Sequence, residues 1–219
     1  METLDQRRAR TKKIIAILKK AHPDARLALD FSNPLELLVA LILAAQARDD
    51  VVNSVTSTLF KKYRTASDWA AESPEKLHEQ LRRINFYRQK TRSIQKACEA
   101  LSEKFGEQVP ANLDDLLTLP GVGRKTANII LGNAFSQLAI GVDTHVARVS
   151  QRVGLTDKSD PDKIEADLMQ IVPEKERVVF CHLLQYHGRR VCTAKKPDCP
   201  HCTIDPLCFF PDKTPSESG

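Results

Sequence analysis

Apolar residues recur along most of the chain at the three- and four-residue spacing of amphipathic helices, and alternating strand patterns are almost absent. Asn33 followed by Pro34 is a typical helix start, with a capping side chain and a proline at the first helical position. Gly106 ends a long basic amphipathic stretch that begins near Tyr87. The pattern predicts an all-α protein with helices at residues 6–21, 34–46, 50–62, 74–83, 87–105, 113–118, 124–134, 144–153, 161–171 and 174–187.

Length and composition are those of a globular protein with one or two domains: 219 residues, 42% hydrophobic and 28% charged. The longest apolar run, Leu37–Ala45, has nine residues, whereas a membrane-spanning helix needs about 20. Residues 1–13 carry charges but lack the apolar core of a signal peptide. We therefore expect a cytoplasmic protein, associated with the nucleoid if the source is bacterial.

Positive charge is concentrated in two places although the net charge is only +5. No acidic residue occurs between Gln80 and Cys98, a segment that contains Arg82, Arg83, Arg88, Lys90, Arg92 and Lys96. The second cluster consists of Arg189, Arg190, Lys195 and Lys196. Either run alone is often just a solvated helix face, but the two together favour a nucleic-acid ligand.

A turn with two glycines, Gly121 and Gly123, separates two short amphipathic segments within residues 119–127, Leu-Pro-Gly-Val-Gly-Arg-Lys-Thr-Ala. Glycines permit a positive φ and leave main-chain N–H groups uncovered, and the following helix directs its positive end at the same place. A phosphate oxygen could bind there. A tight helix connection without a ligand is the alternative.

Lys125 and Asp143 are the candidate catalytic residues. Lys125 falls in the first turn of a predicted helix, where the helix dipole disfavours an ammonium and so favours the neutral, nucleophilic amine; contact with phosphate is the alternative. Asp143 directly precedes another predicted helix, so N-capping alone would explain it, but its carboxylate could also stabilise a positive sugar-like transition state. We interpret His145 and Arg148 as helix-surface groups.

Four of the six cysteines are crowded near the C-terminus with the spacing C-x6-C-x2-C-x5-C: Cys192, Cys199, Cys202 and Cys208. The segment after Gly188 has too little apolar content for a core, so metal ligation could supply its folding free energy. Zinc and an iron–sulfur cluster both remain open, although zinc sites usually contain two C-x2-C pairs and this tail has one. Cys98 and Cys181 lie in apolar helical patterns and are interpreted as inert core residues.

The chain resembles the endonuclease III family of helix–hairpin–helix DNA glycosylases in the order and separation of three motifs. These are the glycine motif at 119–127, the Val-Asp-Thr-His at 142–145 and the four clustered cysteines. The resemblance covers roughly residues 6–212 and implies two helical domains flanking a DNA-binding cleft. One would be a six-helix barrel, residues 27–137, ending in the hairpin. Residues 1–26 and 138–212 would form the iron–sulfur domain, and we expect residues 213–219 to be a disordered tail.

The resemblance also implies a mechanism and a cofactor. Lys125 would form a Schiff base with a damaged pyrimidine nucleotide flipped from duplex DNA and cleave the abasic site by β-elimination, with electrostatic support from Asp143. The four clustered cysteines would bind a [4Fe-4S] cluster. The protein would act as a monomer, without contact to membranes.

Further DNA contacts follow from the resemblance: Gly121, Gly123, Arg124, Lys195 and Lys196 on phosphates. Gln46 would fill the space left by the flipped base, and Phe86 would serve as the wedge. Relatives usually carry a leucine in place of Phe86 and often a glycine in place of Asn85, and several have a polar or acidic residue in place of Leu117, which bears on lesion preference. A Phe86 packed into the barrel core is the alternative to a wedge.

Two other functions are weighed against this one. The related adenine glycosylase of mismatch repair normally lacks the hairpin lysine and carries a further C-terminal domain, so Lys125 and the chain end at Gly219 argue against it. A non-enzymatic helix–hairpin–helix DNA-binding protein would explain the basic clusters and the glycines. It would not explain Lys125 together with Asp143.

Overall fold

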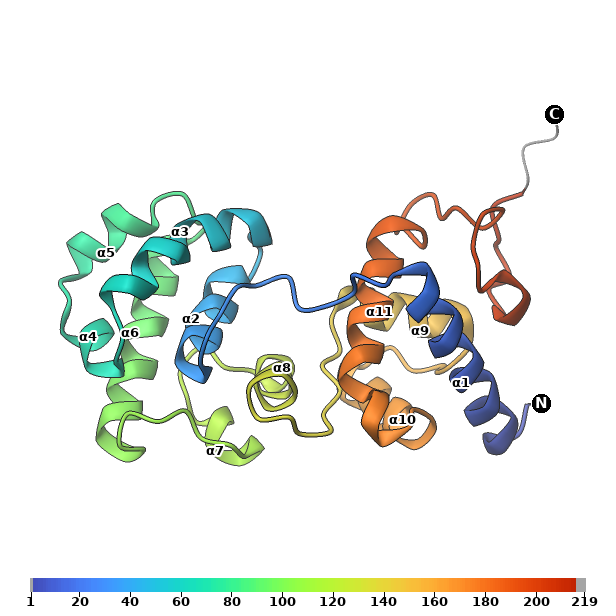
Figure 1. The fold of residues 1–219 in the computed structure, drawn as a ribbon, viewed down its shortest axis with the longest axis horizontal. Helices are drawn as coiled ribbons and strands as arrows, with labels where there is room; N and C mark the ends of the chain where they lie inside the picture. Colours follow the sequence, from blue (N-terminus) through green and yellow to red (C-terminus); the bar gives the residue numbers. More distant parts are fainter. Residues whose placement is uncertain (1, 216–219) are drawn as a thin grey trace. The chain divides into compact units, whose positions relative to one another are not determined.

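The computed structural model describes residues 2–215, and in this part of the chain every regular element is a helix (Figure 1). The chain forms two compact units, Leu27–Gln137 on the one hand and Met1–Arg26 with Leu138–Gly219 on the other. The prediction of an all-α protein is confirmed. No helix within the described residues combines the length and apolarity needed to cross a lipid bilayer.

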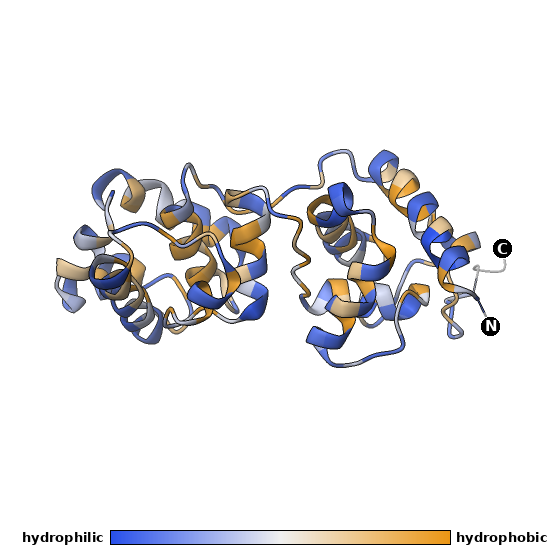
Figure 2. Cartoon of the chain, turned by 90° about the horizontal axis from the view of Figure 1, so that it is seen from below, coloured by the Kyte–Doolittle hydropathy of each residue, from blue (hydrophilic) through white to orange (hydrophobic). Residues whose placement is uncertain are grey.

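The unit Leu27–Gln137 is built around helix α2, Pro34–Ala44, which contacts α3, α6 and α8. Leu37, Leu38 and Leu43 of α2 are fully buried. The other helices of the unit are α3 (Asp49–Lys62), α4 (Ala66–Ala71), α5 (Pro74–Leu81), α6 (Tyr87–Lys104), α7 (Leu113–Leu117) and α8 (Arg124–Ala134). Apolar residues lie mainly on the helix sides that face other helices of the same unit (Figure 2).

Helix α4 is the one element of this unit that the sequence pattern missed. It has six residues and starts with a capping box in which Thr65 and Asp68 each accept a hydrogen bond from the other's main-chain N–H. Trp69 anchors it in the core with 1% of its surface exposed, 4.7 Å from the Tyr63 ring centroid. A helix this short has no apolar repeat to detect, so its stability comes from the cap and the buried indole.

The second unit joins the N-terminal helix α1, Leu4–Ala21, to the C-terminal part of the chain. Helix α1 contacts α10 and α11, and α9 contacts α11 (Figure 1). The remaining elements are α9 (Thr144–Val153), α10 (Pro161–Ile171), the 3-10 helix η1 (Glu174–Glu176), α11 (Arg177–Arg190) and the 3-10 helix η2 (Asp205–Leu207). The segment expected as one helix, 174–187, is therefore a 3-10 turn followed by a helix that continues to Arg190.

Arg10 ties helix α1 to the segment that carries the clustered cysteines. Its guanidinium, 7% exposed, pairs with Glu2 and donates to the carbonyl oxygens of Val153 at 2.8 Å, Gly154 at 2.9 Å and Leu207 at 2.9 Å. Leu207 immediately precedes Cys208. A buried charge is stable only when its donors are satisfied, and here main-chain carbonyls and a carboxylate provide the acceptors.

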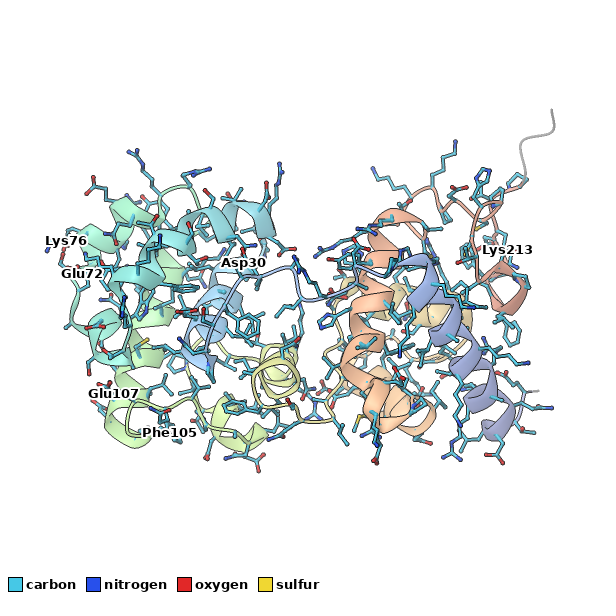
Figure 3. All side chains as sticks on the ribbon, viewed as in Figure 1. Asp30, Glu72, Lys76, Phe105, Glu107 and Lys213 are labelled. Carbon is cyan, nitrogen blue, oxygen red and sulfur yellow. The ribbon has the colours of Figure 1, made fainter. Side chains whose placement is uncertain are left out.

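The end of the described chain is held by polar contacts. Lys213, labelled in Figure 3, pairs through Nζ with the Asp205 carboxylate at 2.9 Å and donates to the main-chain carbonyl oxygen of Asp205 at 3.0 Å. Thr214 Oγ1 donates to the carbonyl oxygen of Pro197 at 2.6 Å. Disorder from Lys213 onward stays an expectation, and its part at residues 216–219 lies outside the described residues.

Candidate active site and cysteine centre

The glycine turn connects α7 to α8 and uses its two glycines differently. Gly121 has a φ of +84°, and a Cβ there would come within 3.0 Å of Ser93 Cβ on α6, so both the main-chain conformation and the packing require glycine. Gly123 has a φ of −97° and is the N-cap of α8. The expected positive φ thus occurs at Gly121 alone. A Cβ added at Gly123 would have no neighbouring heavy atom within 4 Å, so there is open space beside the start of α8.

Helix α8 begins without a side-chain cap and without an acidic residue in its first turn. The first main-chain N–H groups of a helix lack partners within the helix, and they form the positive end of its dipole. In α8 these groups adjoin the open space at Gly123, and Arg124 and Lys125 are the next two residues. This start is suited to an anion such as a phosphate oxygen.

Lys125 is exposed in the first turn of α8. Within residues 2–215 no hydrogen bond or ion pair engages its amine, unlike that of Lys62, which is bound to Glu72 at 2.8 Å. An amine that no acid holds is free to approach an electrophilic carbon.

Asp143 is the N-cap of α9, as its position in the sequence predicts. Its Oδ1 accepts from the main-chain N–H groups of His145 at 2.9 Å and Val146 at 2.7 Å. Both capping bonds use the same oxygen, and the side chain is only partly buried. Capping therefore leaves Oδ2 available for a second interaction, and the capping and catalytic interpretations are compatible.

Gln46 and Phe86 lie on two neighbouring loops of the unit Leu27–Gln137 and share an unusual conformation. Gln46 has a φ of +54° and Phe86 a φ of +58°, the left-handed region that side chains other than glycine rarely adopt. The Asn85 side-chain amide donates to the Gln46 carbonyl oxygen at 3.2 Å and joins the two loops. Helix α2 ends at Ala44, so Gln46 lies in the turn beyond it rather than at the end of the expected helix 34–46.

The Phe86 ring is 61% exposed and lies at the N-cap of α6. The alternative in which this ring packs into the core is therefore wrong. Leu117, the last residue of α7, is also exposed, at 41%. Left-handed conformations at residues other than glycine occur preferentially at functional sites, which agrees with a role of Gln46 and Phe86.

The four clustered cysteines line one cavity, together with Arg152, His187 and Phe210. All four are free thiols of intermediate burial. Arg152 Nη1 donates to Cys192 Sγ at 3.4 Å, and His187 Nε2 lies 3.5 Å from Cys202 Sγ. Cys98 and Cys181, in contrast, are buried in the cores of their units, and burial raises the pKa of each to about 12, as expected for inert thiols.

The chemistry of these cysteines bears on the kind of group they could hold. No three His, Cys, Asp or Glu side chains in the described part of the chain converge on a single metal-ion position. Zinc requires its thiolates about 2.3 Å from one point. Four sulfurs around one cavity form an all-thiolate donor set, which is a set that iron–sulfur clusters use.

Two arginines of α9 hold the chain around Cys192 and the loop that follows it: Arg148, expected as a surface group, and Arg152, which the sequence analysis does not single out. Arg152 donates to the carbonyl oxygens of Thr193 at 2.7 Å and Ala194 at 2.8 Å, and Arg148 donates to those of Gly188 at 2.8 Å and Cys192 at 3.1 Å. Arg148 is therefore not the surface group expected. The available signal was the four-residue spacing of two arginines on one helix face of α9. Lys195 and Lys196, which this loop presents, are exposed.

Comparison with known proteins agrees with this fold. Residues 39–174 match the HhH-GPD superfamily of base excision DNA repair proteins. The endonuclease III of Synechocystis sp. is 44% identical over 209 residues, 95% of each chain, and that of Bacillus subtilis is 44% identical over 187 residues, 85% of each chain.

Solved structures give the same result. The chain is similar to a trapped endonuclease III–DNA covalent intermediate in an estranged-adenine complex, with 42% identity, a TM-score of 0.87, and coverage of 95% of this chain and 97% of that one. The chain thus belongs to the endonuclease III family within the HhH-GPD superfamily. Members of this family are DNA glycosylases with abasic-site lyase activity and bind an iron–sulfur cluster. The adenine-glycosylase and non-enzymatic alternatives are not favoured.

Proposed function

We propose that this base excision repair enzyme removes oxidised pyrimidines from duplex DNA with Lys125 as the nucleophile. The Lys125 amine would form a bond to C1′ of a flipped nucleotide while the glycosidic bond breaks and the base leaves with its electron pair and a proton. Opening of the sugar would give a Schiff base. Loss of a C2′ proton would then expel the 3′ phosphate by β-elimination, and water would release the lysine.

The observation that carries this proposal is the start of α8. The exposed Lys125 amine, which has no acidic partner among residues 2–215, lies in the first helical turn, next to main-chain N–H groups that no described side chain caps. The turn would hold a phosphate on one side of the reacting sugar while Lys125 attacks its C1′. A relative 42% identical to this chain has been trapped as a covalent intermediate with DNA, which supports a nucleophile of this kind.

Asp143 would support the same chemistry through charge. Its Oδ1 is fixed by two main-chain N–H groups, so the carboxylate has one orientation and its other oxygen can face a cationic sugar or iminium. A preorganised carboxylate stabilises positive charge in the transition state without having to reorient during the reaction.

The remaining DNA contacts would come from two kinds of residue. Gly121, Gly123 and Arg124 at the turn, and Lys195 and Lys196 on the cysteine loop, would contact phosphates and supply affinity without sequence preference. Gln46 and Phe86 would enter the base stack. The exposed Phe86 ring can stack on a base next to the extruded nucleotide, and Gln46 can occupy the vacated space. DNA is the substrate, so we expect the enzyme in the cytoplasm, at the nucleoid of a bacterium.

Cys192, Cys199, Cys202 and Cys208 would hold a [4Fe-4S] cluster. Bound there, the cluster would supply cross-links that a segment of low apolar content lacks. The residues around the cluster would hold the loop between Cys192 and Cys199 in the conformation that binds DNA. Arg152 donates hydrogen bonds to the main chain at Thr193 and Ala194, directly before the exposed Lys195. The role derived for the cluster is structural.

A borohydride trapping assay tests the proposal. Duplexes that carry either an abasic site or an oxidised pyrimidine are incubated with the holoprotein, and borohydride reduces any Schiff base to a stable amine. We expect a covalent protein–DNA adduct with both duplexes and none with undamaged DNA. Strand cleavage without any trapped adduct would show that the reaction does not pass through a lysine Schiff base.

A further inference from the structure

Lys90 is a buried lysine in the middle of the basic segment 80–98. It belongs to α6, its residue is 6% exposed, and its Nζ donates to the carbonyl oxygen of Leu43 at 2.8 Å. Leu43 lies in the last turn of α2, a helix with no basic residue of its own there. The last carbonyls of a helix lack donors within the helix and form its negative end. Lys90 thus supplies from α6 the donor that the end of α2 lacks.

The main chain of Lys90 contacts the loop that carries Phe86. Its N–H donates to the carbonyl oxygen of Phe86 at 3.1 Å and closes the first turn of α6. Its side chain holds the end of α2 at Leu43, three residues before Gln46. One residue therefore bonds to both segments whose side chains are proposed to enter the base stack.

Space filling does not account for a lysine at this position. Lys90 shares the apolar face of α6 with Ile94, Ala97 and Leu101, all fully buried. Burial lowers the pKa of Lys90, which reflects the free-energy cost of placing a charged amine there. A methionine has a similar length and would fill the same space without that cost. The distinctive contribution of the lysine is its hydrogen bond to Leu43.

We propose that Lys90 is a positioning residue for base extrusion, which sets the spacing between the Gln46 turn and the Phe86 turn. This inference rests on the DNA contacts proposed above for Gln46 and Phe86. Lys90 does not contact phosphate, because its amine is buried against α2. Its loss affects the opening of a paired duplex, and it leaves the reaction of Lys125 at an existing abasic site intact, since no base has to be extruded there.

The test compares Lys90→Met with Lys104→Met, which makes the same change at an exposed lysine in the last turn of α6. Two single-turnover rates are measured with holoprotein: excision of an oxidised pyrimidine from a fully paired duplex, and strand cleavage at a pre-formed abasic site. The fluorescence of a 2-aminopurine placed beside the lesion reports unstacking. For Lys90→Met we expect excision to fall about tenfold or more, with a smaller fluorescence increase, and abasic-site cleavage to stay within about twofold. Lys90→Arg, which keeps a cationic donor, restores most of the excision rate.

Other results have distinct meanings. Equal losses of Lys90→Met on both substrates, together with a fall in melting temperature, would show that Lys90 only stabilises the core and would overturn the inference. Unchanged excision would overturn it as well. Should Lys90→Met fail to fold, Lys90→Leu carries the same comparison, because it also removes the donor and places an apolar side chain on the buried face of α6. Absence of activity in the wild type and in Lys104→Met would instead contradict the proposed function.

Discussion

The side-chain amide of Asn85 donates to the main-chain oxygen of Gln46 at 3.2 Å, across 39 residues of sequence. The bond joins two turns in which Gln46 and Phe86 each adopt a left-handed main-chain conformation. Such conformations cost free energy at residues other than glycine, on the order of 1–3 kcal/mol each. The contact holds the turns of Gln46 and Phe86 in a fixed relative position. Two side chains that are proposed to enter a base stack together require such a fixed position.

Truncation of the Phe86 side chain tests whether its ring enters the base stack. Phe86→Ala removes the exposed ring, so we expect excision from a fully paired duplex to lose roughly 1–3 kcal/mol of transition-state stabilisation, as for other base–aromatic contacts. Cleavage at a pre-formed abasic site should lose less, because that duplex is already easier to open. The melting temperature should change little, since the ring is 61% exposed. A large melting loss with equal effects on both substrates would remove Phe86 from the DNA-contacting residues.

Replacement of Asp143 by asparagine separates capping from catalysis. Asparagine caps helices about as well as aspartate, so the two hydrogen bonds to Oδ1 can be retained while the charge is lost. We expect turnover to fall about a hundredfold or more, the scale seen when one preorganised electrostatic group is removed, with stability changed by less than about 0.5 kcal/mol. Parallel losses in rate and in melting temperature would leave capping as the whole role of Asp143.

Metal analysis tests the proposed cluster. Purified holoprotein should be brown and should contain about four irons per chain with negligible zinc, as four cysteine ligands of a [4Fe-4S] cluster require. Cys202→Ser should lower the iron content, whereas Cys98→Ser, at a buried cysteine outside the cavity, should leave the iron content of the folded protein unchanged. A colourless, active protein with one zinc per chain would overturn the cofactor assignment and leave the glycosylase assignment standing.

Glu72 gives the unit Leu27–Gln137 a specific acid sensitivity. Hydrogen bonds from Lys62, Tyr63 and the Ser73 N–H lower the pKa of Glu72 from an ordinary 4.5 to about 2, and Lys76 lies beside it (Figure 3). A carboxyl whose pKa is lower in the folded state stabilises that state above the unfolded value, and the contribution is lost as the pH falls through the folded one. The stabilisation should therefore be complete above about pH 4.5 and disappear towards pH 2.

Fluorescence of Trp69 measures this effect in the correct unit, because it is the only tryptophan of the chain and lies in the core of Leu27–Gln137. Glu72→Gln should unfold more readily than the wild type at pH 6, and the difference should shrink between pH 5 and pH 2. Glu75→Gln, at an exposed acid of the next helix, is the control. A constant difference at all pH values would show that the charge of Glu72 is not responsible.

Local signals in the sequence were sufficient for most helices. Asn33, Asp143 and Asp160 each accept the capping hydrogen bond that their positions predict, and Gly106 has the positive φ of a helix end. Helix α4 was missed because six residues contain no repeat. The C-terminal end of helix α2 lies two residues before the expected one because the apolar run continues into the turn that carries Gln46.

Contacts between residues far apart in the sequence could not be predicted from such local signals. Lys90 looks like one more cation of a basic segment, and only its spacing from Ile94, Ala97 and Leu101 places it on the buried face of α6. The left-handed turn at Phe86 has no glycine to mark it, and the Asn85–Gln46 bond depends on how α2 and α6 pack. Such features follow from tertiary structure, which no local pattern encodes.

Loss of the Lys125 amine should abolish both covalent trapping and strand cleavage while leaving DNA binding in place. Main-chain groups and other cations would supply most of the affinity for DNA. Lys125→Ala should therefore bind an abasic-site duplex with an affinity close to that of the wild type. Lys61→Ala, at another surface lysine of the same unit, is the matched control and should trap normally. Normal trapping by Lys125→Ala would rule out Lys125 as the nucleophile.

Mapping of the borohydride-reduced adduct identifies the nucleophile by its attachment site. The wild-type protein is trapped on an abasic-site duplex, digested with a protease and a nuclease, and the modified peptide is identified by mass spectrometry. We expect the sugar remnant to be attached to Lys125, in the first turn of α8. Attachment to any other amine, such as that of Lys90, Lys195 or Lys196, would contradict this expectation.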